Sequence, residues 1–176
     1  MISPAGKVRV LGLDPGSLRT GWGVVEPAPD GWRLSLVAGG TIVNPAARPF
    51  NGRLRHIFEQ LSQVISRHQP LELAVEDVFA AKNARTALLL GQARGVALLA
   101  GALAGLPIHE YAPTAVKKAL VGTGRAAKEQ VRTMVEVILK QTLPPPKEFS
   151  LDASDALAIA VCHLHSRAIR GLGSRS

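Results

Sequence analysis

The sequence contains a single cysteine, Cys162, and few aromatic residues. One thiol excludes an intramolecular disulfide, and the N-terminus shows neither a signal-peptide pattern nor an apolar run long enough to span a bilayer. These absences favour a reducing cytoplasm. Because only 4% of the chain is aromatic while 47% is hydrophobic, we expect a core of Ala, Val, Leu and Ile, which suits helices packed on a sheet.

Acidic residues are also scarce. The 13 Asp and Glu are outnumbered by 21 Lys and Arg, so the formal charge is +8 and the pI is near 10.4. Such a chain attracts polyanions, and nucleic acid is favoured over a membrane surface because no strongly amphipathic basic helix stands out. Its 176 residues suit one domain. We expect a flexible leader at 1–6, a single domain at 7–170 and a disordered tail at 171–176.

The hydrophobic pattern predicts an α/β fold with a five-stranded mixed sheet and helices on both faces. Strands are expected at about 7–14, 20–27, 31–43, 71–78 and 106–112, and helices at 51–69, 83–105, 114–120, 126–141 and 152–170. The first two strands should form an antiparallel hairpin, and Gly39-Gly40 should interrupt the third. A helix precedes the fourth strand, which should therefore return parallel to the first.

The helix expected at 83–105 is apolar nearly all round and contains four glycines. A helix with so little polar surface must be covered on more than one side. Pairing with a second copy of the chain is the commonest way to hide such a face, so we favour a homodimer. The alternative is an interior helix of a monomer.

Four acidic residues occupy unusual positions. Asp14 ends the first strand at a Pro-Gly turn, Glu76 ends the fourth strand, and Asp152 and Asp155 open the last helix on one face. Each has a simpler interpretation, because Asp14 is a good turn residue and the last two could cap the helix. Taken together, however, they would converge if the first and fourth strands are neighbours and the last helix crosses their ends.

Several carboxylates at one point would repel one another and hold their protons unless a cation lay among them. Oxygen ligands select Mg²⁺ or Mn²⁺ over zinc, and two such ions about 4 Å apart promote phosphodiester hydrolysis. His163 and His165 lie two turns beyond the Asp pair, too far along the helix for this site. We interpret them as structural or solvent-facing.

The positions of the basic residues also indicate phosphate binding. Between Lys117 and Arg132 the only acid is Glu129, against five cations that could contact phosphates: Lys117, Lys118, Arg125, Lys128 and Arg132. The alternative is a solvated helical face. Phe79 follows the Glu76 strand in a loop with Lys82 and could stack on an unpaired base, although a single Phe in a loop is more often part of the core.

These motifs occur together in one known family. The chain resembles the bacterial RuvC family of Holliday junction resolvases from about Lys7 to His165, in register over several separate motifs. They are Leu13-Asp14-Pro15-Gly16-Ser17, Thr20-Gly21-Trp22-Gly23, Val75-Glu76-Asp77-Val78-Phe79, Ala81-Lys82-Asn83, Leu90-Gly91-Gln92-Ala93-Arg94-Gly95 and Asp152-Ala153-Ser154-Asp155-Ala156-Leu157-Ala158.

The resemblance implies a ribonuclease H-like fold and a homodimer with Mg²⁺-dependent endonuclease activity on four-way DNA junctions. It implies that Asp14, Glu76, Asp152 and Asp155 bind the metal, that Phe79 stacks near the junction centre, and that Lys117 and Lys128 contact DNA. A branch-migration motor of the RuvA and RuvB type is an implied partner. Family members often carry a second bulky residue where this chain has Ala80, which implies a smaller wedge.

Two other classes of function share some of these features. Actin-like kinases and ATPases also begin with an Asp-x-Gly turn, but they need two such domains and this chain has room for one. In a protein that binds junctions without cutting them, the acids would cap helices or turns and the cations would bind the DNA. We expect instead a dimeric nuclease whose two-fold axis relates two symmetric nicks.

Overall fold

The computed structural model describes residues 8–31, 33–77 and 83–173. The strands are β1 (Val10–Asp14), β2 (Arg19–Pro27), β3 (Leu34–Val43), β4 (Glu72–Glu76) and β5 (Ile108–Tyr111). The helices are α1 (Phe50–His68), α2 (Ala84–Leu103), α3 (Pro113–Val121), α4 (Lys128–Leu139) and α5 (Leu151–Gly173). The elements occur in the predicted order and overlap the predicted ranges.

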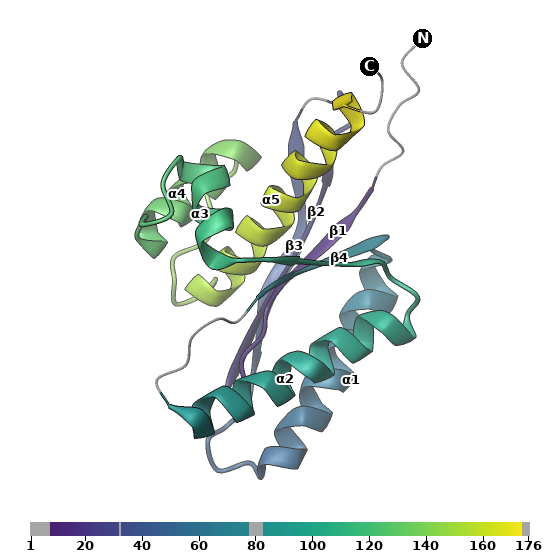
Figure 1. The fold of residues 1–176 in the computed structure, drawn as a ribbon, viewed down its shortest axis with the longest axis vertical. Coiled ribbons are helices and arrows are strands. Elements are labelled where there is room, and N and C mark those ends of the chain that lie inside the picture. The colour runs from purple at the N-terminus through teal and green to yellow at the C-terminus, as the bar shows by residue number, and fades with distance from the viewer. Residues whose placement is uncertain (1–7, 32, 78–82, 174–176) are drawn as a thin grey trace.

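The strands form one sheet in the order β3-β2-β1-β4-β5. β1 pairs antiparallel with β2 and parallel with β4, and β5 extends the parallel half. Helices cover both faces: α1 and α2 lie on one side, and α5 with α3 and α4 on the other (Figure 1). The predicted mixed sheet with helices on both faces is therefore confirmed.

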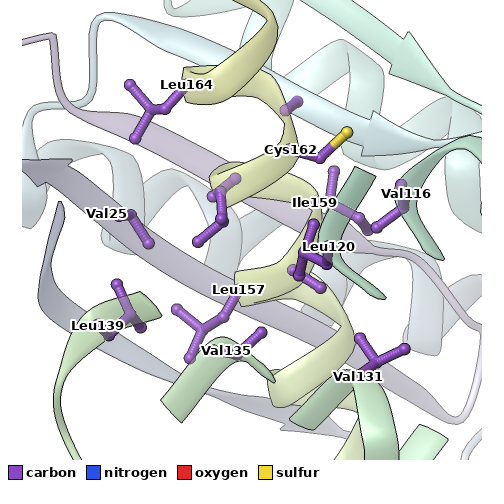
Figure 2. Packing of buried hydrophobic residues seen from close by; sticks show 14 of the residues in the cluster. Val25, Val116, Leu120, Val131, Val135, Leu139, Leu157, Ile159, Cys162 and Leu164 are labelled. Carbon is purple, nitrogen blue, oxygen red and sulfur yellow. The ribbon is translucent and has the colours of Figure 1, made fainter. Parts of the chain in front are cut away.

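Each face of the sheet has its own apolar core. Under α1 the core includes Ile57, Leu61 and Ile65, spaced four residues apart on one face of the helix. On the other side, α5 is central, and Figure 2 shows Leu157 and Ile159 in one cluster with side chains from β2, α3 and α4. Consequently α5 is held between the sheet and two other helices.

The α2 helix is covered on one face only. Ala93, Ala97 and Ala100 are buried, whereas Leu88 and Leu103 on the outside are 66% and 69% exposed. The interior-helix alternative is therefore wrong for the single chain. By length and composition α2 could cross a membrane, with a mean hydropathy of 1.4. Its Arg94, however, forms ion pairs with residues of the sheet region, as in a helix packed on a domain.

Two expected boundaries differ from the structure. β3 continues through Gly39-Gly40, and the irregularity in its pairing with β2 falls instead between Val24 and Val25. The glycines serve close packing, because a Cβ on Gly39 would lie 2.8 Å from the Phe149 ring. In addition, α5 extends to Gly173, into the segment expected to be a disordered tail.

Candidate active site

Asp14 and Glu76 lie at the same edge of the sheet. β1 and β4 are parallel, with Leu13 paired to Val75, so the next residue of each strand places its carboxylate beside the other. The turn after Asp14 is fixed by buried Thr20, whose hydroxyl donates to the Gly16 carbonyl at 2.8 Å. A local turn and a long-range strand pairing thus define the first half of the site.

The α5 helix reaches this edge because glycines lie beneath it. A Cβ added to Gly12 of β1 would lie 2.0 Å from the carbonyl oxygen of Ala156, and one added to Gly21 of β2 would lie 2.0 Å from that of Asp152. Both distances are far below van der Waals contact. Gly21 is also the pairing partner of Asp14. The first turn of α5 therefore rests on the strand backbone next to Asp14.

The capping interpretation of the last two acids is wrong. The residue before α5 is Ser150, whose hydroxyl accepts from the amide of Ala153 at 3.2 Å. The two carboxylates bind cations instead. Asp152 accepts from Nε of Arg19 at 2.6 Å, and Asp155 accepts from Nζ of Lys128 at 2.5 Å.

The four carboxyl groups, here called the acid cluster (Asp14, Glu76, Asp152 and Asp155), perturb one another. Burial and the charges of Glu76 and Asp155 raise the pKa of Asp14 from 3.8 to about 7. Burial followed by the charge of Asp155 raises the pKa of Glu76. The pKa of Asp155 is also raised by burial, although Lys128 opposes this. Negative charge is thus concentrated in a poorly hydrated site, which is where a bound cation gains most.

The expected DNA-contact cations divide into three groups. Lys128 and Lys117 both act electrostatically on the acid cluster. Lys118, on α3, and Arg125, in the turn before α4, are exposed. Phe79 and Lys82 lie outside the described residues.

Arg132 was expected among the phosphate-binding cations, and that expectation is wrong. It is buried, and its guanidinium donates to the Phe149 carbonyl at 3.0 Å and the Ser154 hydroxyl at 2.9 Å, with a further bond to the Pro144 carbonyl. Such a residue must be paired when buried. Arg132 therefore ties α4 to the start of α5 and faces no ligand.

Sequence reasoning missed two residues that shape the site, Arg19 and Ser150, and assigned Arg132 the wrong role. Arg19 holds Asp152, Ser150 caps α5, and Arg132 fixes the loop that leads into it. Ser150 carried a usable signal, because Ser directly before an apolar helical run is a standard cap. Arg19 and Arg132 meet partners 133 and 22 residues away in sequence, which no local pattern reveals.

Comparison with known proteins agrees with this geometry. The family described as "Crossover junction endodeoxyribonuclease RuvC" matches residues 10–163. The chain belongs to the RuvC family. A RuvC of Pelobacter propionicus is 53% identical over 159 residues, which cover 90% of this chain and 87% of that protein.

Solved RuvC structures share the fold over nearly the whole chain. The structure of Thermus thermophilus RuvC has a TM-score of 0.80 at 35% identity and covers 92% of this chain and 96% of that one. The same protein in complex with a Holliday junction substrate has a TM-score of 0.79 at 32% identity, with the same coverage. The chain therefore has the ribonuclease H-like fold of these structures.

RuvC nucleases are metal-dependent, and the acid cluster has the donor chemistry for a hard dication. All its donors are carboxylate oxygens, which suit Mg²⁺ or Mn²⁺. His163 is buried, and its Nδ1 shares a hydrogen bond with the Tyr111 hydroxyl at 2.7 Å. It does not belong to the acid cluster, so its expected structural position is confirmed.

Proposed function

We propose that the acid cluster holds two Mg²⁺ ions and that each subunit of a homodimer cuts one phosphodiester of a four-way DNA junction. Membership of the RuvC family makes the chain a junction-resolving endonuclease of DNA recombination and repair. The proposal assigns that activity to Asp14, Glu76, Asp152 and Asp155. The observation that carries it is the convergence of four carboxyl groups from β1, β4 and α5, with the pKa of Asp14 raised to about 7.

Bound divalent ions supply an activated water and stabilise the leaving oxygen in phosphodiester hydrolysis. The chain contributes a fixed set of acids, because two come from paired strands and two from a helix seated on their backbone. Lys128 hydrogen-bonds Asp155 and lowers its pKa against the effect of burial, and Arg19 hydrogen-bonds Asp152 at 2.6 Å. Mn²⁺ has the same ligand preference and is expected to substitute for Mg²⁺.

The DNA is expected to cross the side of the domain that carries α3 and α4. Lys117 and Lys128 lie near the acids, and the exposed Lys118 and Arg125 extend the positive charge outward. Phosphate contacts of this kind position a nuclease on its substrate without reading sequence. Phe79 and Lys82, in the segment after β4, remain proposed junction contacts on the basis of the family resemblance.

We assign the dimer interface to the outer face of α2. Leu88, Leu99 and Leu103 expose apolar surface there, and a Cβ added at Gly91 or Gly95 would meet nothing within 4 Å. Small residues flanked by exposed leucines allow a second helix to approach closely. A two-fold axis through this face gives two equivalent active sites, which suits paired nicks. A branch-migration motor of the RuvA and RuvB type is the expected partner complex.

The test uses a synthetic four-way junction. Asp14→Asn, Glu76→Gln and Asp155→Asn should each abolish Mg²⁺-dependent cleavage while junction binding in a gel-shift assay persists. Glu59→Gln, which alters an exposed pair with Arg55 on α1, is the matched control and should cleave normally. Binding without cleavage by the unaltered chain, with Mg²⁺ and with Mn²⁺, would favour the binding-only alternative and refute the proposal.

The interface is tested separately by sedimentation. Leu88→Asp should convert the dimer to a monomer and abolish paired nicking. Val137→Asp is the control, because Val137 is 62% exposed on α4 and carries the same charge change to a different face. A dimer that survives Leu88→Asp and Leu99→Asp together would exclude this face.

A further inference from the structure

Three potential metal-ligating side chains meet at the other end of β4 from the acid cluster. They are Glu72 at the start of β4, His109 on β5 and His163 on α5. One ligand atom of each lies within 4.8 Å of the other two. No short sequence motif contains them, because 91 residues separate Glu72 from His163.

We propose that Glu72, His109 and His163 form a second metal site, which binds one Zn²⁺ or a similar transition-metal dication. Two imidazoles and one carboxylate are the donor set of many zinc sites with an open fourth position, and they disfavour Mg²⁺. The site is independent of the proposed nuclease function, because none of its residues belongs to the acid cluster.

The distances fit a metal with small side-chain adjustments. Oε2 of Glu72 is 2.5 Å from Nε2 of His163 and 3.6 Å from Nε2 of His109. Ligand atoms around a tetrahedral Zn²⁺ are about 3.4 Å apart, given metal–ligand bonds of about 2.0–2.1 Å. The Glu72–His163 pair must therefore open by about 1 Å. His109 is free to adjust because its side chain is 35% exposed.

The surroundings already orient the three ligands. Tyr111 bonds Nδ1 of His163 at 2.7 Å, which fixes the ring and directs Nε2 toward Glu72. Hydrogen bonding of the second ring nitrogen is typical of metal-bound histidine. Arg167 donates to Oε1 of Glu72 at 2.8 Å and so leaves Oε2, the oxygen nearest both imidazoles, for the metal.

Two arginines and a histidine act electrostatically on Glu72 and His163. Arg167 contacts Glu72 directly, and Arg170 and His109 act on His163. Burial, the largest effect, lowers the pKa of His163, which keeps its imidazole in the neutral form that binds metals.

A metal here would join α5 to β4 and β5. Glu72 and Glu76 are four residues apart on β4, which is about 13 Å of strand. His163 follows Asp155 by eight residues, which is about 12 Å of helix. The second site would thus fix the same strand and helix that carry the acids, from their opposite ends.

The test measures zinc bound per chain in dialysed full-length protein, with millimolar Mg²⁺ present to occupy the acid cluster. We expect one equivalent of Zn²⁺, and a melting temperature about 5–10 °C higher when free zinc is a hundredfold above Kd. His109→Gln and Glu72→Gln should each lose the equivalent and the shift. His56→Ala, which removes a histidine of α1, should keep both.

The result that overturns the proposal is equally direct. Wild-type protein that takes up no zinc, or glutamine variants that still bind one equivalent with an unchanged shift, would show that this cluster is not a metal site. Neither readout involves DNA cleavage. Failure here leaves the nuclease assignment intact, and failure of the cleavage assay leaves this site standing.

Discussion

Replacing Asp14 by Asn is expected to stabilise the metal-free protein at alkaline pH. In the unfolded chain this carboxyl loses its proton near 3.8, but in the fold it does so at about 7. Between these values the unfolded state is ionised while the folded state is not. The contribution of protonated Asp14 to the free energy of unfolding is therefore complete below pH 3.8 and is lost as the pH rises to about 7.

The magnitude follows from the pKa difference. One pKa unit corresponds to about 1.4 kcal/mol, so a rise from 3.8 to about 7 corresponds to about 4 kcal/mol. Residual solvent contact of Asp14 reduces this to about 2–4 kcal/mol. An amide has the shape of the protonated acid and never ionises. Asp14→Asn should therefore raise stability by about 2–4 kcal/mol at pH 8 and by much less at pH 4.

Urea unfolding in EDTA at the two pH values measures this difference. In melting temperature the gain at pH 8 is about 4–16 °C for a domain of this size. Glu59→Gln is the control, because the exposed ion pair that it removes from α1 contributes little to stability. An Asp14→Asn variant that is no more stable than wild type at pH 8 would refute the reasoning that burial and the neighbouring acids destabilise ionised Asp14 without metal.

Four other substitutions have defined outcomes. Gly21→Ala should abolish junction cleavage and lower the melting temperature, because the new Cβ has no space beneath α5; cleavage and thermal melts measure both effects. Arg132→Met should cost about 2–4 kcal/mol in urea unfolding, since it leaves buried oxygens unpaired. Arg125→Met should leave stability unchanged but weaken junction binding and reduce its salt slope by about one. Lys128→Met should slow cleavage and move the acid limb of its pH profile upward, because Lys128 lowers the pKa of Asp155.

Each of these has a contrary result. Gly52→Ala is the control for Gly21, since its nearest neighbour is the flexible Arg48 side chain, and it should be tolerated. Equal stability losses in Arg132→Met and Arg125→Met would contradict the buried role of the former. An unchanged pH profile in Lys128→Met would show that the Asp155 contact does not control ionisation.

The sheet and half of the site follow from local signals. Alternating apolar residues, a Pro-Gly turn after Asp14 and a helix before β4 suffice to predict a hairpin and a parallel return, and these place Asp14 beside Glu76. The sequence also predicts that Asp152 and Asp155 share a helix face. That the helix reaches the strands depends on glycines in β1 and β2, whose purpose is visible only when α5 is packed on them.

Other features could not be predicted because their partners are remote. Arg132 has the same charge as its neighbours Arg125 and Lys128, and only the packing of α4 against α5 decides that it is buried. Ser150 and Asp152 are both good capping residues two positions apart, and only the exact start of α5 decides that Ser150 is the cap. Glu72, His109 and His163 come from three elements that tertiary structure brings together.

The direct packing of α5 on the backbone of β1 and β2 affects which amino-acid substitutions this protein tolerates. Where a helix rests on side chains, a swap of Leu for Val shifts it by a fraction of an ångström. Here Gly12 and Gly21 let main chain touch main chain, so at these positions no side chain separates the strand acids of the proposed site from the helix acids. Substitutions that accumulate in the apolar cores over many generations can therefore lower the folding stability while the spacing of the acids stays constant.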